Sequence, residues 1–428
     1  MKISNIFNFV RLGGALIQKP STWQVVLGGV IVLAIVMGIS RFAYTPLLPL
    51  MQESSGLTDA MAGFLASSNY LGYLLGALAA GWIAPAHRLP TLRLYLVLNI
   101  LSTFVMGCVE EYWIWFAIRF LAGLTSGLVF VLASSMVLDH LVDIGRTTWS
   151  GLFYGGTGLG ILITGLLVPV LQVRFFWSGT WIGFGIISFI TSSLVFYWLR
   201  VVPDANNKST SPIPPLQANA HKSKRWLLPW LLLAYGLEGF GYIISGTFLV
   251  ALIQTIPTLS FNPAFSWALV GLAAIPSCYL WALVAKHWGN LKALVAAYLL
   301  QIIGVLLPIL AVNATGILLG SALFGATFMG ITTLSMAEAR SIAPGKSNQI
   351  IGYFTAFYGV GQLLGPAIAG LFITQSGSYT SSLILAACGL GLGLVLLLIA
   401  QWRQRQLHHL ELTHQINLRK DDPEDAVY

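Results

Sequence analysis

The 428-residue sequence predicts an all-α integral membrane protein in which twelve transmembrane helices form two pseudo-symmetric six-helix halves. Three observations predict this fold: a scarcity of charge, twelve long apolar runs and an internal repeat. Hydrophobic residues make up 57% of the chain and charged residues only 8%, whereas a soluble domain carries about 25% charged residues. So few charges cannot cover a soluble surface, so cytosolic enzymes, nucleic-acid-binding proteins and secreted disulfide-rich proteins are excluded.

The apolar runs set the organisation of the chain, because a helix needs about 20 apolar residues to cross a bilayer. Such runs lie at 23–50, 60–83, 91–109, 113–138, 149–171, 176–199, 226–254, 265–285, 292–311, 315–337, 349–374 and 379–402. The predicted parts are therefore a cytoplasmic N-terminal segment (1–22), an N-terminal half (23–199), a cytoplasmic linker (200–225), a C-terminal half (226–402) and a cytoplasmic tail (403–428). Residues 3–18 are expected either to lie flat on the membrane surface or to be a disordered leader.

The basic residues predict the orientation. All 22 Lys and Arg residues, except Arg41, Arg119 and Arg174, fall in segments that lie inside when the N-terminus is cytoplasmic. Basic residues favour the cytoplasmic side of a membrane, so both termini are expected there. The same distribution explains the net charge of +8 and gives no reason to expect a nucleic acid as a partner.

The chain also matches itself when it is shifted by about 200 residues. The matched pairs are Gly38 with Gly236, Phe42 with Phe240, Tyr44 with Tyr242, Gly151 with Gly352, Phe153 with Phe354, Gly158 with Gly359, and Gly160 with Gly361. Six spans return the chain to its starting side, so the two halves are expected to share one orientation. Secondary transporters are often built in this way, with the substrate site at the repeat interface near mid-membrane.

Several motifs resemble the major facilitator superfamily, and in particular its YbfB/YjiJ type. The resemblance rests on SRFAYTPLLPLMQ at 40–52, AGFLASSNYLGYLLGALAAGW at 62–82 and EGFGYIISGTFLVAL at 238–252, and it covers about 23–402. Span 4 carries the superfamily pattern of an Arg followed by spaced glycines, as Arg119, Gly123 and Gly127. The resemblance implies a monomeric transporter of a bacterial inner (plasma) membrane, with a small-molecule substrate, protons and the lipid bilayer as partners.

The glycine motif that the superfamily associates with antiporters is only partly reproduced. Span 11 supplies most of it, as Gly352, Gly361, Gly365, Pro366 and Gly370. The superfamily places this motif in span 5, where the present chain has Thr164 and Gly165 instead of Gly-Pro. The loops after spans 2 and 8 also lack the Asp of the usual cytoplasmic signature, so gating by that Asp does not carry over. Glycines in these spans, Gly158 and Gly359 included, are expected to serve helix packing.

Three charges lie well inside the predicted spans, where an ionised side chain costs about 2.5–3.5 kcal/mol. They are Arg41, Arg119 and Glu238, and the resemblance places their spans around a central cavity. Arg41 could bind a carboxylate or phosphate of the substrate, or it could extend to the membrane surface or stabilise the backbone near Pro46. Glu238 is the best candidate for a proton carrier, but it could also form a permanent ion pair with either arginine. Arg119 is linked to proton coupling by the resemblance, or it could donate to backbone carbonyls.

Further candidates are uncharged or lie at the cytoplasmic ends. The uncharged cavity candidates, each of which could equally be an interhelical hydrogen-bond partner, are Tyr44, Asn69, Tyr154, Thr157, Tyr242, Phe324, Thr327, Tyr358 and Gln362. The candidates for cytoplasmic ion-pair gates, or for ordinary charges at headgroup level, are Arg88, Asp139, Arg146, Lys286, Glu338 and Arg340.

These patterns predict a secondary active transporter that works by alternating access, with proton coupling and with export slightly favoured. The first alternative is proton-coupled uptake of a small organic anion, which Arg41 favours. The alternative from another class is a polytopic membrane enzyme or signalling scaffold, which would need a reactive polar cluster at a membrane face. The sequence shows no catalytic, cofactor-binding or metal-binding motif, and its three cysteines lie in separate apolar runs, so no enzyme activity, cofactor or metal is expected.

Overall fold

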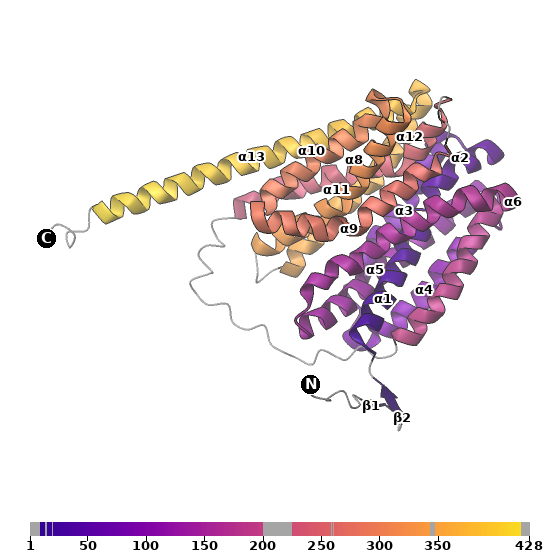
Figure 1. Cartoon of the computed structure of the whole chain (residues 1–428), viewed down its shortest axis with the longest axis horizontal. Helices are drawn as coiled ribbons and strands as arrows, with labels where there is room; N and C mark the ends of the chain where they lie inside the picture. The colour runs from indigo at the N-terminus through magenta and orange to yellow at the C-terminus, as the bar shows by residue number, and fades with distance from the viewer. Residues whose placement is uncertain are drawn as a thin grey trace.

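The computed structural model describes residues 9–12, 15–18, 20–199, 225–257, 259, 261–342 and 347–420. In Figure 1 the helices separate into two groups, one coloured indigo to magenta and one orange to yellow. The first group, called the N-terminal half, consists of α1 (Thr22–Leu33), η1 (Ala34–Ile39), α2 (Tyr44–Ser55), α3 (Asp59–Ala80), α4 (Arg88–Val105), α5 (Tyr112–Asp143) and α6 (Ser150–Trp198). The second, called the C-terminal half, consists of α8 (Leu228–Gln254), α9 (Ala264–Trp288), α10 (Asn290–Leu310), α11 (Ala314–Ile342), α12 (Ser347–Ser376) and α13 (Tyr379–Lys420).

The helices confirm an all-α membrane protein. Nine helices among the described residues are long and apolar enough to cross a membrane, and α1, η1 and α2 count together as one of them. Helix α6 is also counted once, although Phe176 inside it has non-helical backbone angles (φ 55°, ψ −172°) that separate two helical segments. Helices α3 and α4 are not among the nine. The count of twelve transmembrane helices therefore stays a prediction.

The first span is broken in its middle. Between α1 and α2 the chain forms the π-helix η1, in which amide groups bond five residues back, as from Ser40 to Ile35 at 2.8 Å. Proline lacks an N–H, so Pro46 cannot donate to the carbonyl of Phe42, and the amide of Thr45 takes that place at 3.3 Å. The carbonyl of Arg41 consequently loses the amide that a continuous α-helix would supply.

Glycines matched by the internal repeat make equivalent contacts in the two halves. A Cβ added to Gly38 would lie 2.2 Å from the Cα of Gly160, and one added to Gly361 would lie 2.1 Å from the carbonyl of Gly236. Span 1 therefore packs on α6 as α8 packs on α12. These contacts support the packing role that the sequence predicts for Gly160 and Gly361, and they support a pseudo-two-fold relation between the halves.

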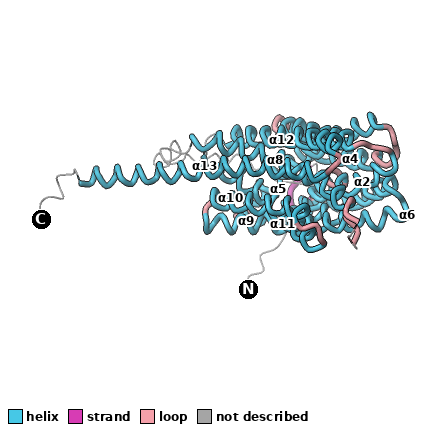
Figure 2. Tube along the Cα trace, turned by 90° about the horizontal axis from the view of Figure 1, so that it is seen from above, coloured by secondary structure: helices cyan, strands magenta, loops and turns pink. Residues whose placement is uncertain are grey.

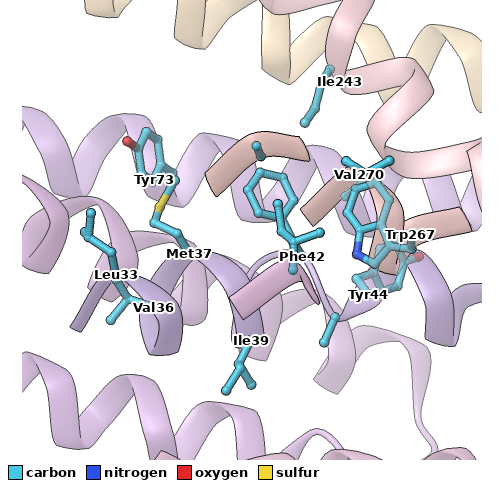
Figure 3. Close-up of a cluster of buried hydrophobic side chains, with 14 of the residues drawn as sticks. Leu33, Val36, Met37, Ile39, Phe42, Tyr44, Tyr73, Ile243, Trp267 and Val270 are labelled. Atoms are coloured by element: carbon cyan, nitrogen blue, oxygen red, sulfur yellow. The ribbon is translucent and has the colours of Figure 1, made fainter. Parts of the chain in front are cut away.

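The two halves meet through α6 against α9 and α3 against α12. Gly158 lies against Gly271 of α9, and Gly63 of α3 lies against the carbonyl of Pro366 in α12. Side chains fill the centre of this interface. Figure 3 shows Phe42 between Met37 of the first span and Trp267 of α9, and the Phe42 and Trp267 ring centroids are 6.2 Å apart.

The two ends of the chain differ from the sequence-based expectation. Phe9–Leu12 (β1) and Ala15–Gln18 (β2) pair as antiparallel strands, so the expectation of a disordered leader is wrong for these residues. Their place at the membrane surface stays a prediction. Helix α13 was expected to end near 402 but continues to Lys420, well beyond the other helices (Figure 2). Residues 403–420 contain no Gly or Pro, so no helix-breaking residue interrupts α13 beyond 402. The predicted linker falls almost entirely outside the described residues.

Candidate functional site between the two halves

Among the described residues, the hydrogen bonds that join the two halves lie from mid-span to one end of the bundle, called here the Asp59 end. At this end the hydroxyl of Tyr379 donates to Asp59 Oδ1 at 2.6 Å, and Gln52 Nε2 donates to the same oxygen at 2.7 Å. The amide of Ala60 donates to Thr374 Oγ1 at 3.1 Å. Together these contacts hold α2 and α3 against α12 and α13. A pocket of about 490 Å³ lies beside this cluster.

At the middle of the same interface Thr45 donates its hydroxyl to the carbonyl of Gly246. This bond joins the start of α2 to α8, so the broken first span contacts its repeat partner directly. Thr45 could not be predicted from the sequence, because a threonine near a proline in an apolar run carries no distinguishing pattern.

The opposite end of the bundle, called the Asp139 end, holds one of the predicted gate pairs. Arg88 Nη1 lies 3.2 Å from Asp139 Oδ2, and both side chains are partly exposed. This pair joins two helices of the N-terminal half, α4 and α5. Arg146 instead lies over the ring of Trp149, with its Cζ 4.8 Å from the centroid.

The corresponding residues of the C-terminal half differ in exposure. Lys286 is exposed and Glu338 is buried. Arg340 lies in α11, but its side chain is outside the described part of the structure. The second gate pair therefore stays a prediction.

Arg119 is bound to the backbone of the broken first span. It is 1% exposed. Its Nη1 donates to the carbonyl of Ser40 at 3.2 Å and its Nη2 to the carbonyl of Arg41 at 3.5 Å. Its Cζ also lies 4.6 Å from the ring centroid of Tyr44. Arg119 thus supplies donors where the helix break leaves a carbonyl without its amide, as the structural alternative for this residue predicts.

Arg41 is buried without a carboxylate partner. Its guanidinium carbon lies 4.0 Å from the ring centroid of Tyr73 and 4.7 Å from that of Tyr70, both on α3. Nη1 contacts the sulfur of Met37 at 3.9 Å, while Nε and Nη2 have no hydrogen-bond partner among the described residues. Arg41 therefore does not extend to the membrane surface in this conformation. Ring faces stabilise its charge, and two of its nitrogens remain available.

Glu238 is fully buried on α8, and it does not pair with an arginine in this conformation. Its Oε1 accepts a hydrogen bond from Gln301 Nε2 of α10 at 3.3 Å, whereas Oε2 has no hydrogen-bond partner among the described residues. The one ion pair formed by described residues is that of Arg88 and Asp139. A permanent pair of Glu238 with Arg41 or Arg119 is thus contradicted for this state.

Aromatic rings of the C-terminal half form a column beside these two charges. Tyr235 stacks on Tyr358 with centroids 4.4 Å apart, and Tyr358 stacks on Tyr242 at 5.5 Å. Tyr242 continues to Phe328 at 5.7 Å, and Phe328 to Phe324 at 5.6 Å. All four ring pairs lie within 18° of parallel. These five rings are called the aromatic column.

The aromatic column interacts with both charged residues. Gln362 of α12 donates to the hydroxyl of Tyr242. Tyr358 interacts with the carboxyl group of Glu238, and both Tyr242 and Tyr358 interact electrostatically with Arg41. Tyr358 of the column therefore interacts with both Glu238 and Arg41. Four of the predicted residues, Tyr242, Phe324, Tyr358 and Gln362, are brought together here.

The remaining uncharged candidates mostly hold helices together. Tyr44 donates to the carbonyl of Ala62 at 3.0 Å, and Asn69 Nδ2 donates to that of Arg119 at 2.9 Å. Thr327 bonds within its own helix. Tyr154 packs against Phe130 and Phe153, and Thr157 is fully buried.

Besides Thr45 and the residues at the Asp59 end, five residues around Arg41, Glu238 and the aromatic column were not predicted from the sequence. They are Tyr70, Tyr73, Tyr235, Gln301 and Phe328. Gln301 was detectable, because it is the one amide side chain in the apolar run 292–311. The aromatic residues give no such signal, since aromatic residues are common in membrane helices.

Comparison with known proteins agrees with this architecture. Residues 33–398 match the model of a family described as "Uncharacterised MFS-type transporter YbfB". The chain belongs to this family of major facilitator superfamily (MFS) transporters. Among its relatives, the MFS-type transporter YceJ of Bacillus subtilis is 27% identical, over 80% of this chain and 87% of the relative.

Two further proteins show how widely the fold of this MFS transporter is shared. The probable sulfoacetate transporter SauU of Cupriavidus necator is 22% identical over 88% of this chain and 93% of its own. A crystal structure of a mutant of the nucleoside transporter NupG superposes with a TM-score of 0.69, at 14% identity, over 88% of this chain and 99% of that one. The substrates in these two names differ, so the shared fold does not determine the substrate.

Proposed function

We propose that this MFS transporter moves a small organic solute by alternating access and exchanges a proton at Glu238 during the cycle. The observation that carries the proposal is the environment of Glu238. A buried carboxylate without a cation partner is costly. Glu238 has only neutral neighbours, the amide of Gln301 and the hydroxyl of Tyr358, and its Oε2 has no hydrogen-bond partner among the described residues. The carboxyl group is therefore best satisfied with a proton in this conformation. A change of conformation that brings a cation close would favour release of the proton.

The bonds at the Asp59 end support alternating access. If the N-terminus is cytoplasmic, the Asp59 end is the outer end and the Asp139 end the inner one. The Tyr379–Asp59 contact then closes the outer side, whereas the Arg88–Asp139 pair lies within one half and leaves the inner side free to open.

Export is the direction we favour, as the antiporter-type glycines of α12 indicate. Their contacts account for part of this motif through packing, since Gly361 lies against Gly236 and Gly370 against the carbonyl of Asp59. The second candidate function is proton-coupled uptake of a small organic anion. Two unpartnered nitrogens on the buried Arg41 favour it, and so does the relationship to SauU, whose name specifies an organic anion.

Purified protein in proteoliposomes with an imposed pH gradient tests the proposal. Solid-supported-membrane currents from a panel of organic solutes identify a transported compound, and its accumulation is then measured for two variants. Glu238→Gln should abolish gradient-driven accumulation and retain exchange without a gradient, because glutamine keeps the shape but cannot exchange the proton. Glu53→Gln, at an exposed carboxylate, is the matched control. Full accumulation by Glu238→Gln would refute coupling at this residue.

A further inference from the structure

We propose that the site around Arg41 binds a planar aromatic carboxylate, which names the substrate class of the transporter. This proposal rests on the proposed function, because it assigns the substrate to the same interface. It depends on two independent features of the described residues: a buried arginine without an anion, and a facing wall of stacked rings.

The arginine specifies the charged group of the ligand. Arg41 is 2% exposed, and its Nε and Nη2 have no hydrogen-bond partner. Buried polar groups are normally paired, so these two donors indicate a ligand that accepts from both. A carboxylate accepts two parallel bonds from a guanidinium. The rings of Tyr70 and Tyr73 lie 4.7 and 4.0 Å from the guanidinium carbon and stabilise its charge, and the carboxylate would accept from Nε and Nη2.

The aromatic column specifies the rest of the ligand. Tyr242 and Tyr358 interact with Arg41 from the C-terminal half, so a carboxylate bound to Arg41 would place its organic part beside these rings. Tyr358 is partly exposed, whereas Tyr235, Tyr242, Phe324 and Phe328 are buried. Tyr358 is therefore the part of the column that a ligand meets first. Aromatic rings favour offset-stacked or edge-to-face contact with another ring, which a planar aromatic ligand supplies and a saturated ring does not.

The neighbouring polar groups are compatible with a single negative charge on the ligand. Glu238 accepts from Gln301 and forms no ion pair with Arg41 among the described residues, so it does not neutralise Arg41 in this conformation. One carboxylate balances Arg41. Arg119, the other buried arginine, uses Nη1 and Nη2 to hold the backbone of the first span, so we assign the carboxylate to Arg41.

Three probe compounds separate the two features. Benzoate has both the charge and the planar ring, cyclohexanecarboxylate keeps the charge but loses the planarity, and benzamide keeps the ring but loses the charge. Binding is measured on the full-length protein in detergent, by the ligand-induced shift in melting temperature at several concentrations. Benzoate is expected to bind in the millimolar range that its size allows. The other two should bind at least about threefold more weakly.

Two substitutions test the residues. Arg41→Lys should weaken benzoate about tenfold or more, because a point charge does not replace the two-pronged guanidinium. Phe328→Leu should weaken benzoate binding roughly threefold, because it removes one ring of the stacked column. The affinity for cyclohexanecarboxylate should stay unchanged. The matched controls are Arg174→Lys and Tyr353→Leu, at exposed positions, and they should bind benzoate as the unmodified protein does. Tyr242→Leu is a second column variant if Phe328→Leu does not fold.

Several outcomes would overturn the proposal. They are benzoate that does not bind, cyclohexanecarboxylate or benzamide that binds as tightly as benzoate, and Arg41→Lys with undiminished benzoate binding. These measurements use no gradient, so they are independent of proton coupling. Full accumulation by Glu238→Gln would refute the coupling proposal alone, whereas equal binding of the three probes would refute only the substrate class.

Discussion

The first span and α8 are repeat partners, yet one is broken and the other is continuous. In both, a backbone glycine packs against a glycine of the partner helix, Gly38 on Gly160 and Gly236 on Gly361. In the first span the π-helix η1 and Pro46 interrupt the hydrogen bonding, whereas α8 is one helix from Leu228 to Gln254. The two repeats therefore share the glycine packing contacts, whereas the backbone hydrogen bonding differs between the first span and α8.

This difference explains where the buried charges lie. The break in the first span places Arg41 at the interface and leaves carbonyls that need Arg119 as a donor. The continuous α8 needs no such donor, and it carries Glu238 with the neutral partner Gln301. The asymmetry between two related helices thus provides one cationic and one proton-binding group near a shared interface.

The largest effect is expected for alanine at the two related glycines. Gly38→Ala places a methyl group 2.2 Å from the Cα of Gly160, whereas Gly236→Ala places it 3.3 Å from the nearest atom, the carbonyl of Phe357. Overpacking against backbone cannot be relieved by rotating a side chain, so Gly38→Ala should lower the free energy of unfolding by about 3 kcal/mol. Gly236→Ala should change it by less than about 1 kcal/mol. Thermal unfolding in detergent measures both, and equal shifts would contradict the structural difference between the two helices.

An intermediate effect is expected at Arg119. When the two halves are aligned by the repeat so that Gly123 matches Gly325, Arg119 matches Ser321. The hydroxyl of Ser321 donates within its own helix, to the carbonyl of Ile317 at 2.8 Å. Arg119→Gln should lower the free energy of unfolding by about 1–3 kcal/mol, because it removes donors from buried carbonyls. Ser321→Ala is the matched control and should have little effect. A similar loss for both variants would show that the broken span does not depend on Arg119.

The smallest effect is expected at the Arg88–Asp139 pair. Exposed ion pairs contribute about 0–1 kcal/mol, and both of these side chains are partly exposed. Asp139→Asn should therefore leave thermal stability nearly unchanged. Asp143→Asn, at an exposed position on the same helix, is the control. If Asp139 acts as a gate, initial transport rates should change in Asp139→Asn and not in the control, and equal rates in both variants would count against a gate there.

Part of the site could be predicted, because a charged side chain inside an apolar span is energetically costly and is therefore easy to recognise in the sequence. Charges are rare in apolar runs, so Arg41, Arg119 and Glu238 stood out, and the structure places all three in the interior. The pairing among them could not be predicted, because it depends on distances between helices that are far apart in the chain. The predicted partner of Glu238 was an arginine, and the observed hydrogen-bond partner is Gln301 of a different helix.

The sequence by itself determined the membrane-embedded helical class, the repeat and the glycines that pack it, because composition and small residues act locally and regardless of partner. Only the tertiary structure decided that Arg119 serves the backbone while Arg41 remains without an anion. The two arginines have the same chemistry, and what separates them is which groups face each one. The helix break at 34–43 could not be predicted from the sequence either, because contacts with neighbouring helices stabilise the π-helix. Ser126 of α5 supplies one such contact, since its hydroxyl donates to the carbonyl of Val36 at 2.8 Å.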